Sequence, residues 1–204
     1  MFARPRGVLL VMLVLACGDD GGVTPPIDSS AAADASPAVD AAPDAPVGTF
    51  TLTSPTIIEG GTIPLTHVCT NQGGQNRSPE LAWTNPPAGT QSFAVVFTDR
   101  SNNLVHSVIY DIPASATGLP ADVDNVYAPP EVPGAHQTTG YDNATRGYLG
   151  PCPGSQHTYE LAVYALSAPT LPNATMSTTR AAAVTAIMAN DLGVATLTAT
   201  HTPP

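Results

Sequence analysis

Two histidines and an aspartate are the residues of this sequence whose chemistry best suits the binding of a small ligand. Asp99 and His106 lie on either side of a short polar turn, and His157 comes just before a later apolar run. Imidazoles can donate hydrogen bonds to an anion, more strongly when protonated, and a nearby carboxylate orients the ring and raises its pKa. A single histidine in a strand is more often a satisfied core or surface residue, so these positions define a candidate site.

Other chemistries fit these residues less well. Two histidines and a carboxylate are also a possible metal set, but no His-x-His or His-x3-His spacing supports a preformed site. The sequence lacks the Gly-x-Ser-x-Gly motif, and Ser155 lies in a Pro/Gly loop with no identifiable base. Cys152 would be a nucleophile only as a free thiolate. We therefore expect a binding protein that is not an enzyme and uses no metal or cofactor.

The charge balance argues against nucleic acid as a partner. The chain of 204 residues has six basic residues, all arginine, against sixteen acidic ones, and its net charge is −10. A protein that binds a phosphate backbone needs a positive surface to release counterions, and this sequence lacks one.

Residues 1–16 have the features of a lipoprotein signal peptide. Two arginines precede an apolar run at residues 7–16, which is too short to span a bilayer. The segment ending in Ala16-Cys17 resembles the bacterial lipobox, in which the cysteine thiol is lipidated. We expect a mature chain that begins at a lipidated Cys17; ordinary secretion with Cys17 discarded is the alternative. Gly18 follows, rather than the Asp associated with inner-membrane retention, which favours the outer membrane or a periplasm-facing position in the cell envelope.

Residues 17–48 are expected to form a disordered tether after the lipidated cysteine. Residues 18–48 contain eight Ala, six Asp and five Pro, without an aromatic or basic residue. Such a composition cannot bury enough apolar surface to offset the chain entropy lost on folding.

The two remaining cysteines are a candidate disulfide. If Cys17 is acylated, Cys69 and Cys152 form an even pair in an exported chain, where disulfides persist. The alternative is two separate buried thiols that pack as small apolar groups.

Residues 49–204 have the pattern of one mostly β domain. Alternating or buried-strand runs lie at residues 50–53, 92–99, 104–112, 158–166 and 194–201, and residues 92–112 have the form of two adjacent antiparallel strands. One helix is predicted at residues 177–191, ending before Gly193. The Pro- and Gly-rich stretch 113–154 is predicted to be a long ordered excursion of the kind that often builds binding sites.

Several segments of this domain resemble, in order and spacing, the bacterial Raf-kinase-inhibitor-like branch of the phosphatidylethanolamine-binding protein family. They cover nearly all of residues 50–201. The matching segments are Ile63-Pro64 with residues 66–69, Ser78 to Trp83, Pro87 to Ser92, His106 to Pro113 with Thr117 to Pro120, and Gly147 to Pro153 with His157 and Tyr159.

The resemblance implies a Greek-key β core of two packed antiparallel sheets with a peripheral C-terminal helix. It also implies a small surface pocket for anions such as phosphate head groups. The family's second pocket carboxylate is missing here, and Arg100 is expected to add a positive charge beside the site. By position, the ligand-binding residues are Asp99, His106, Gly150, Pro151 and His157, with Tyr148 as a wall.

The function we expect is a membrane-tethered extracytoplasmic binding protein for a small anion or phospholipid head group. Its contact with the membrane would be through the lipid anchor only. The alternative is a protein inhibitor, for instance of a protease, and a hydrolase is less favoured.

Overall fold

The computed structural model describes residues 48–204. Residues 1–47, which include Cys17, the predicted signal peptide and nearly all of the predicted tether, lie outside the described residues. The elements in chain order are β1 (Thr51–Thr53), β2 (Gly61–Thr62), η1 (Leu65–His67), η2 (Thr70–Gln72), β3 (Leu81–Thr84), β4 (Ser92–Asp99), β5 (Leu104–Pro113), β6 (Gly118–Leu119), β7 (His136–Gln137), β8 (His157–Leu166), α1 (Arg180–Ala189) and β9 (Asp191–His201).

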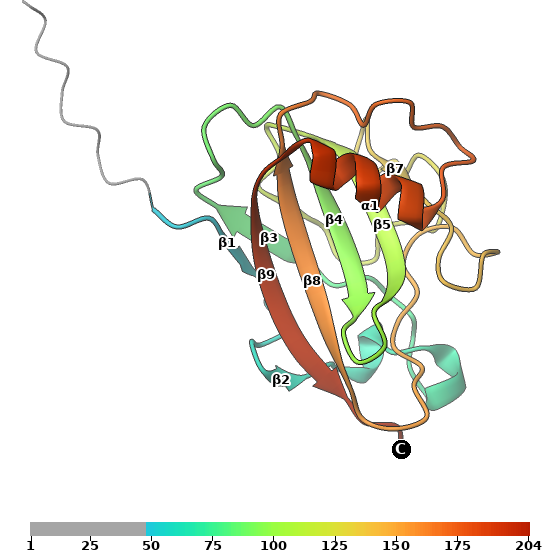
Figure 1. Ribbon diagram of the computed structural model, residues 1–204. Coiled ribbons are helices and arrows are strands. Elements are labelled where there is room, and N and C mark those ends of the chain that lie inside the picture. The colour runs from blue at the N-terminus through green and yellow to red at the C-terminus, as the bar shows by residue number, and fades with distance from the viewer. Residues whose placement is uncertain (1–47) are drawn as a thin grey trace, which may run out of the picture. The chain divides into compact units, whose positions relative to one another are not determined.

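Two sheets form the domain, which confirms the predicted mostly β class. The larger sheet has the order β2-β9-β8-β4-β5-β7, and the smaller has the order β1-β3-β6 (Figure 1). Neighbouring strands are antiparallel except for the two-residue β2, which runs parallel to β9. As predicted, β4 and β5 are adjacent antiparallel strands. Strand β8 lies inside the sheet because it pairs with both β4 and β9.

Strand β4 shows why the large sheet is covered on both faces. Every residue of β4 is buried, and successive side chains of a strand point to opposite faces. One face of β4 carries Phe93, Val95 and Phe97, which pack in the same cluster as residues of the small sheet. In that cluster the Phe93 ring lies 5.1 Å from the Trp83 ring. Ala94 and Val96 pack on the other face, in the cluster that contains residues of α1. Full burial of a Val or Phe side chain contributes about 1.5–3 kcal/mol relative to exposure.

The helix is shorter than predicted. It begins after the N-cap Thr179, whose side chain accepts a hydrogen bond from the amide of Ala182, and it ends at Ala189, before the C-cap Asn190. Strand β9 follows at once and contains Gly193, so this glycine is not the helix cap. A Cβ atom at Gly193 would lie 2.8 Å from Cγ of Pro87, so the close approach of that loop requires glycine there.

The disulfide between Cys69 and Cys152 is present, with a Cα–Cα distance of 5.5 Å, and the alternative of two free thiols is excluded. The bond joins the start of η2 to the loop before β8 across a sequence separation of 83 residues. In the loop-closure model, a bond that closes a loop of this length lowers the entropy of the unfolded chain. This stabilises the folded state by about 4.5 kcal/mol.

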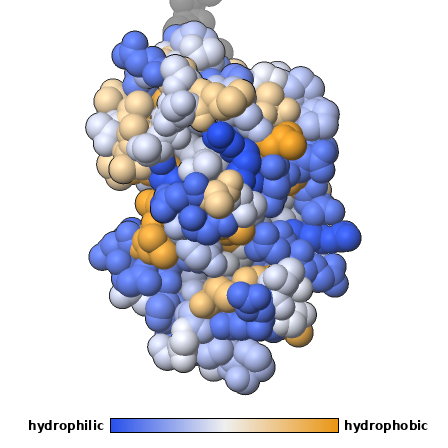
Figure 2. Space-filling model, turned by 90° about the vertical axis from the view of Figure 1, so that its right-hand side faces the viewer, coloured by the Kyte–Doolittle hydropathy of each residue, from blue (hydrophilic) through white to orange (hydrophobic). Residues whose placement is uncertain are grey.

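The surface in Figure 2, the face on the right-hand side of Figure 1, is mostly hydrophilic. Hydrophobic residues on this face form separate small patches, as is usual for a water-exposed surface. Within residues 48–204, no helix is long and apolar enough to cross a membrane.

Candidate functional site

The β4–β5 hairpin and the start of β8 bring the three predicted side chains together. Asp99 ends β4, where it is paired with Leu104 of β5 on one side and Tyr159 of β8 on the other. His106 lies in β5, and His157 is the first residue of β8. This arrangement follows from the pairing of both strands with β4.

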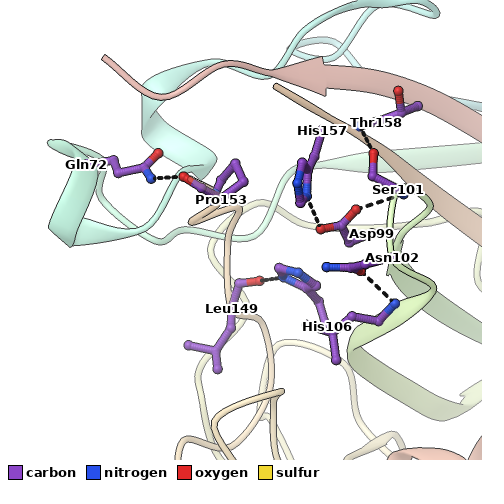
Figure 3. A network of polar contacts seen from close by, with 10 residues as sticks. Gln72, Asp99, Ser101, Asn102, His106, Leu149, Pro153, His157 and Thr158 are labelled. Atoms are coloured by element: carbon purple, nitrogen blue, oxygen red, sulfur yellow. Dashed lines mark hydrogen bonds and ion pairs between the residues drawn. The ribbon is translucent and has the colours of Figure 1, made fainter. Parts of the chain in front are cut away.

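The side chains of Asp99 and His157 lie in ion-pair contact, with the Asp99 carboxylate buried (Figure 3). Nδ1 of His157 lies 2.6 Å from Oδ2 of Asp99, and the aspartate side chain is only 3% exposed. The other carboxylate oxygen accepts a hydrogen bond of 2.9 Å from the amide of Ser101 in the turn. The carboxylate therefore fixes the orientation of the His157 ring and leaves its Nε2 as the free ring nitrogen.

His106 is held by a backbone carbonyl and by aromatic rings. Its Nδ1–H donates to the carbonyl oxygen of Leu149 over 2.9 Å. Its ring lies 4.4 Å from that of Tyr141 and 5.5 Å from that of Tyr159. Burial lowers the pKa of His106, although the Leu149 hydrogen bond and the Asp99 charge oppose this shift. The structure therefore favours a neutral ring at this position.

A pocket of about 90 Å³ opens between these residues. One ordered water needs roughly 10–15 Å³ of such space, so the pocket has room for a small anion. Its lining residues are Asp99, Asn102, Leu104, His106, Tyr141, Cys152, Pro153, His157 and Tyr159.

Among the lining residues that the sequence analysis did not assign to the site, Tyr159 carried a local signal. It lies two residues after His157 in the same strand, and side chains at that spacing point to the same face. Burial, followed by the charge of Asp99, raises the pKa of the Tyr159 phenol, which keeps it protonated. Tyr141 had no such signal, because it lies in the irregular excursion between β7 and β8.

Tyr148 does not line this pocket, contrary to the expectation that it forms a wall. Its ring stacks on Phe97 in the core at 5.3 Å. Its hydroxyl donates to the carbonyl oxygen of His67 over 2.9 Å.

Gly150 and Pro151 also lie outside the pocket lining, and they hold the loop in place. The amide of Gly150 donates to Oδ1 of Asn76 over 2.7 Å, and a Cβ atom there would lie 2.1 Å from the carbonyl oxygen of His67. Pro151 is fully buried and accepts a hydrogen bond from the amide of Cys69. The amide of Gly150 is therefore not free to bind a ligand, and proline has no amide hydrogen to donate.

The basic side chain that influences the pocket is Arg180, rather than the expected Arg100. Arg100 points to Glu160, with 3.9 Å between their charged atoms, and is absent from the pocket lining. The charge of Arg180 is close enough to contribute to the lowered pKa of His106.

The remaining histidines of the described residues make hydrogen bonds elsewhere. His67 bonds to Arg77 and Thr56, His201 to Gln72, and His136 to Asp111. Within the described part of the chain, no group of three or more His, Cys, Asp or Glu side chains is placed to hold a metal ion.

Residues 53–202 match the family described as phosphatidylethanolamine-binding protein. This chain belongs to that family. A UPF0098 protein of Methanothermobacter thermautotrophicus is 39% identical to this chain over 111 residues, which cover 52% of this chain and 69% of the relative. The UPF0098 protein YbcL of Escherichia coli is 33% identical over 135 residues, covering 60% of this chain and 72% of YbcL.

Solved structures agree with the phosphatidylethanolamine-binding protein fold. The crystal structure of E. coli YbcL, described as a new member of the mammalian PEBP family, aligns with a TM-score of 0.69 and 30% identity, over 76% of this chain and 99% of that one. A putative PEBP homologue from Chlamydia trachomatis, CT736, aligns with a TM-score of 0.62 at 22% identity, over 76% of this chain and 98% of that one, and supports the fold alone.

Proposed function

We propose that this chain is a binding protein for a small anion or a phosphorylated head group, held in the pocket of Asp99, His106 and His157. The observation that carries the proposal is that the buried Asp99 carboxylate orients the His157 ring in a pocket of about 90 Å³, which His106 also lines. Family membership supports a ligand-binding fold.

His157 places a hydrogen-bonding ring nitrogen in the pocket. With Nδ1 bonded to Asp99, a protonated ring presents a charged Nε2–H donor. The exposed amide of Asn102 lines the same pocket and provides a neutral donor. Anion binding should therefore strengthen as the pH falls through the range in which histidine gains a proton.

Binding rather than catalysis is the proposed activity. Cys152 lines the pocket beside His157, but its sulfur is bonded to Cys69 and is not available as a thiolate. We further propose that the protein is an extracytoplasmic lipoprotein of the Raf-kinase-inhibitor-like branch, anchored through Cys17 at the outer membrane or on a periplasm-facing surface.

Titration of the full chain with inorganic phosphate tests the pocket. We expect binding that strengthens from about pH 7.5 to about pH 5.5, the range in which imidazoles titrate. His157→Ala should weaken it about tenfold or more, because a charged donor is lost. His136→Ala is the matched control, since His136 also bonds to a carboxylate, that of Asp111, but lies outside the pocket lining.

Absence of phosphate binding across this pH range would remove the proposed function. Equal affinity in the wild type and His157→Ala would show that the anion binds elsewhere. A protein inhibitor that acts through a surface loop would keep its inhibitory activity in His157→Ala. Retained inhibition in this variant would therefore favour the inhibitor function over anion binding.

A further inference from the structure

The large sheet is only partly covered at its β9 side. Strand β2 pairs with β9 at Ala199 and Thr200, and among residues 48–204 no other strand pairs with this side of β9 (Figure 1). The carbonyl oxygen of Thr198 accepts a hydrogen bond from the amide of Gly60, and the amide of Thr198 donates to the Glu59 carboxylate over 2.8 Å. These contacts cover β9 from its C-terminal end as far as Thr198.

The next stretch of β9, from Val194 to Thr196, has an open edge. In an antiparallel strand, the backbone groups of alternate residues point to the same side. The amides and carbonyls of Val194 and Thr196 therefore point the same way as those of Thr198, away from β8. In the described part of the chain, no backbone or side-chain group bonds to them on that side. The open edge thus offers two donors and two acceptors in the spacing of one further strand.

The side chains of this stretch do not protect the edge. Proteins usually block an exposed strand edge with lysine, proline or another charged residue. Residues 192–197 read Leu-Gly-Val-Ala-Thr-Leu, and Leu192 and Val194 are exposed apolar side chains. The register shift of β9 lies near its start and leaves the pairing from Val194 onward regular. An edge of this kind is suited to pairing with another polypeptide segment.

A groove of about 580 Å³ lies along the open edge. It is lined by β1, by residues 194–197 of β9 and by the connection after β1, which contributes Ile57 and Ile58. Ala195 and Leu197 point into the core cluster that includes the small sheet. Residues of an added strand opposite them would point the same way, into the groove. The groove therefore has room for apolar side chains at alternate positions of that strand.

Exposed carboxylates lie at both ends of the open edge. Glu59 is held at one end by the Thr198 amide, and Asp191 is the first residue of β9 at the other. None of the described residues that line the groove is basic. An added strand with a basic residue at each end would therefore be complementary in charge.

We propose that the open edge of β9 binds an extended peptide segment of a partner protein, with basic residues at its ends and apolar side chains in the groove. Charge disfavours two other occupants. A second copy paired antiparallel on this stretch would bring Asp191 of one copy near Glu59 of the other. Residues 18–47 of this chain contain six aspartates and no basic residue. The groove shares no lining residue with the anion pocket, so this proposal is independent of the proposed function.

The probe is the heptapeptide Lys-Val-Thr-Ile-Thr-Val-Lys, acetylated and amidated at its ends. In the antiparallel pairing, its isoleucine lies opposite Ala195 and its two threonines lie opposite Thr196 and Val194. Calorimetric titration of the full chain at low salt should show binding. N-methylation of both threonines should weaken binding at least about tenfold, because it removes the two amides that donate to β9. N-methylation of the isoleucine, whose amide points away from β9, is the matched control and should change affinity less than about threefold.

Two further comparisons test the charge of the partner. A peptide with glutamates in place of both lysines should bind more weakly than the lysine peptide. Glu59→Gln should weaken the lysine peptide about threefold, as expected for an exposed ion pair, and it keeps an acceptor for the Thr198 amide. Glu80→Gln is the matched control, because Glu80 is also exposed but does not line the groove. Equal binding of the lysine and glutamate peptides would overturn a basic partner.

Hydrogen exchange at single amides of the wild-type chain gives a test that does not depend on a variant's folding. The lysine peptide should slow exchange at Val194 and Thr196 at least about tenfold, and it should leave Ala195, whose amide faces β8, unchanged. No binding, unchanged exchange at Val194 and Thr196, or equal affinity of the threonine-methylated peptide would overturn the proposal. Strong protection of both amides in the free chain would also overturn it. Sedimentation would then identify the occupant as a second copy if the chain is a dimer, or as residues 1–47 if it is a monomer.

Discussion

Buried and exposed charges act differently in this domain. The Asp99–His157 pair has its carboxylate only 3% exposed, and the carboxylate also accepts a backbone hydrogen bond. The Arg100–Glu160 pair is longer, at 3.9 Å, and the arginine is 53% exposed. Surface pairs of that kind contribute about 0–1 kcal/mol, whereas removing one partner of a buried pair leaves an uncompensated charge. Substitutions at Asp99 should therefore affect both the pocket and the fold.

His106 should make the stability of the domain depend on pH. Burial lowers its pKa in the folded state, so the unfolded chain takes up a proton first as the pH falls below about 6.5, the ordinary histidine value. Stability then declines from that pH down to the folded-state pKa, because the unfolded state binds more protons. His201, whose pKa burial also lowers, should act in the same direction.

Denaturant unfolding at about pH 7 and about pH 5 measures this effect. The free energy of unfolding should fall between the two pH values, and it should fall less in His106→Phe than in the wild type. Tyr141→Phe is the control, because it keeps the ring beside His106 and removes no group that titrates in this range. An equal fall in His106→Phe and the wild type would contradict the burial argument.

Among the elements, α1 supports one wall of the pocket from a distance. The segment 139–146 begins and ends with the Thr139–Arg146 bridge and carries Tyr141, whose ring covers His106. Arg180, the first residue of α1, donates to the carbonyl oxygens of Thr139 and Gly140 and, over 3.0 Å, to Oδ1 of Asn143. The helix thereby fixes the segment on which Tyr141 lies.

Arg180→Met should loosen this wall without removing a pocket residue. We expect faster hydrogen exchange at the amides of Gly140 and Thr145, weaker phosphate binding and a loss of roughly 1 kcal/mol in stability, because three charge-assisted hydrogen bonds are lost at a partly exposed site. Arg77→Met is the matched control, since Arg77 pairs with the exposed Asp122. Unchanged exchange in segment 139–146 would show that α1 does not hold it.

At the scale of the whole molecule, the proposed pocket and the proposed anchor are separate parts of one chain. The pocket lies between residues 99 and 159, and Cys17 lies outside the described residues.

The anchor is tested on the whole chain expressed in a bacterial host that processes lipoproteins. Mature protein should begin at an acylated Cys17 and fractionate with membranes, and Cys17→Ser should move it to the soluble fraction, since acyl chains supply about 0.8 kcal/mol per buried methylene. Ala16→Ser, which keeps both the thiol and a small residue before it, is a conservative control. Mass spectrometry of an unmodified N-terminus beyond residue 17 would contradict the anchor.

The strands that carry Asp99, His106 and His157 could be predicted from the sequence because their signals are local. Short apolar runs bounded by turn residues indicate β4, β5 and β8, most of whose residues are buried, and the short turn between β4 and β5 places Asp99 near His106. The order of motifs along the chain indicated the family, which residues 53–202 match. An even pair of cysteines indicated the disulfide that the structure contains.

The details of the pocket depended on tertiary structure, because side chains in irregular segments take their direction from distant partners. Tyr148, in a loop, turns into the core toward the His67 carbonyl, while Tyr141 is positioned by Arg180 from a helix about forty residues later. The free state of Nε2 of His106 likewise depends on the carbonyl of Leu149, 43 residues away. No local pattern encodes such contacts, so composition and periodicity identified the ionisable residues, and only the packed structure decided which atoms of the pocket remain free for a ligand.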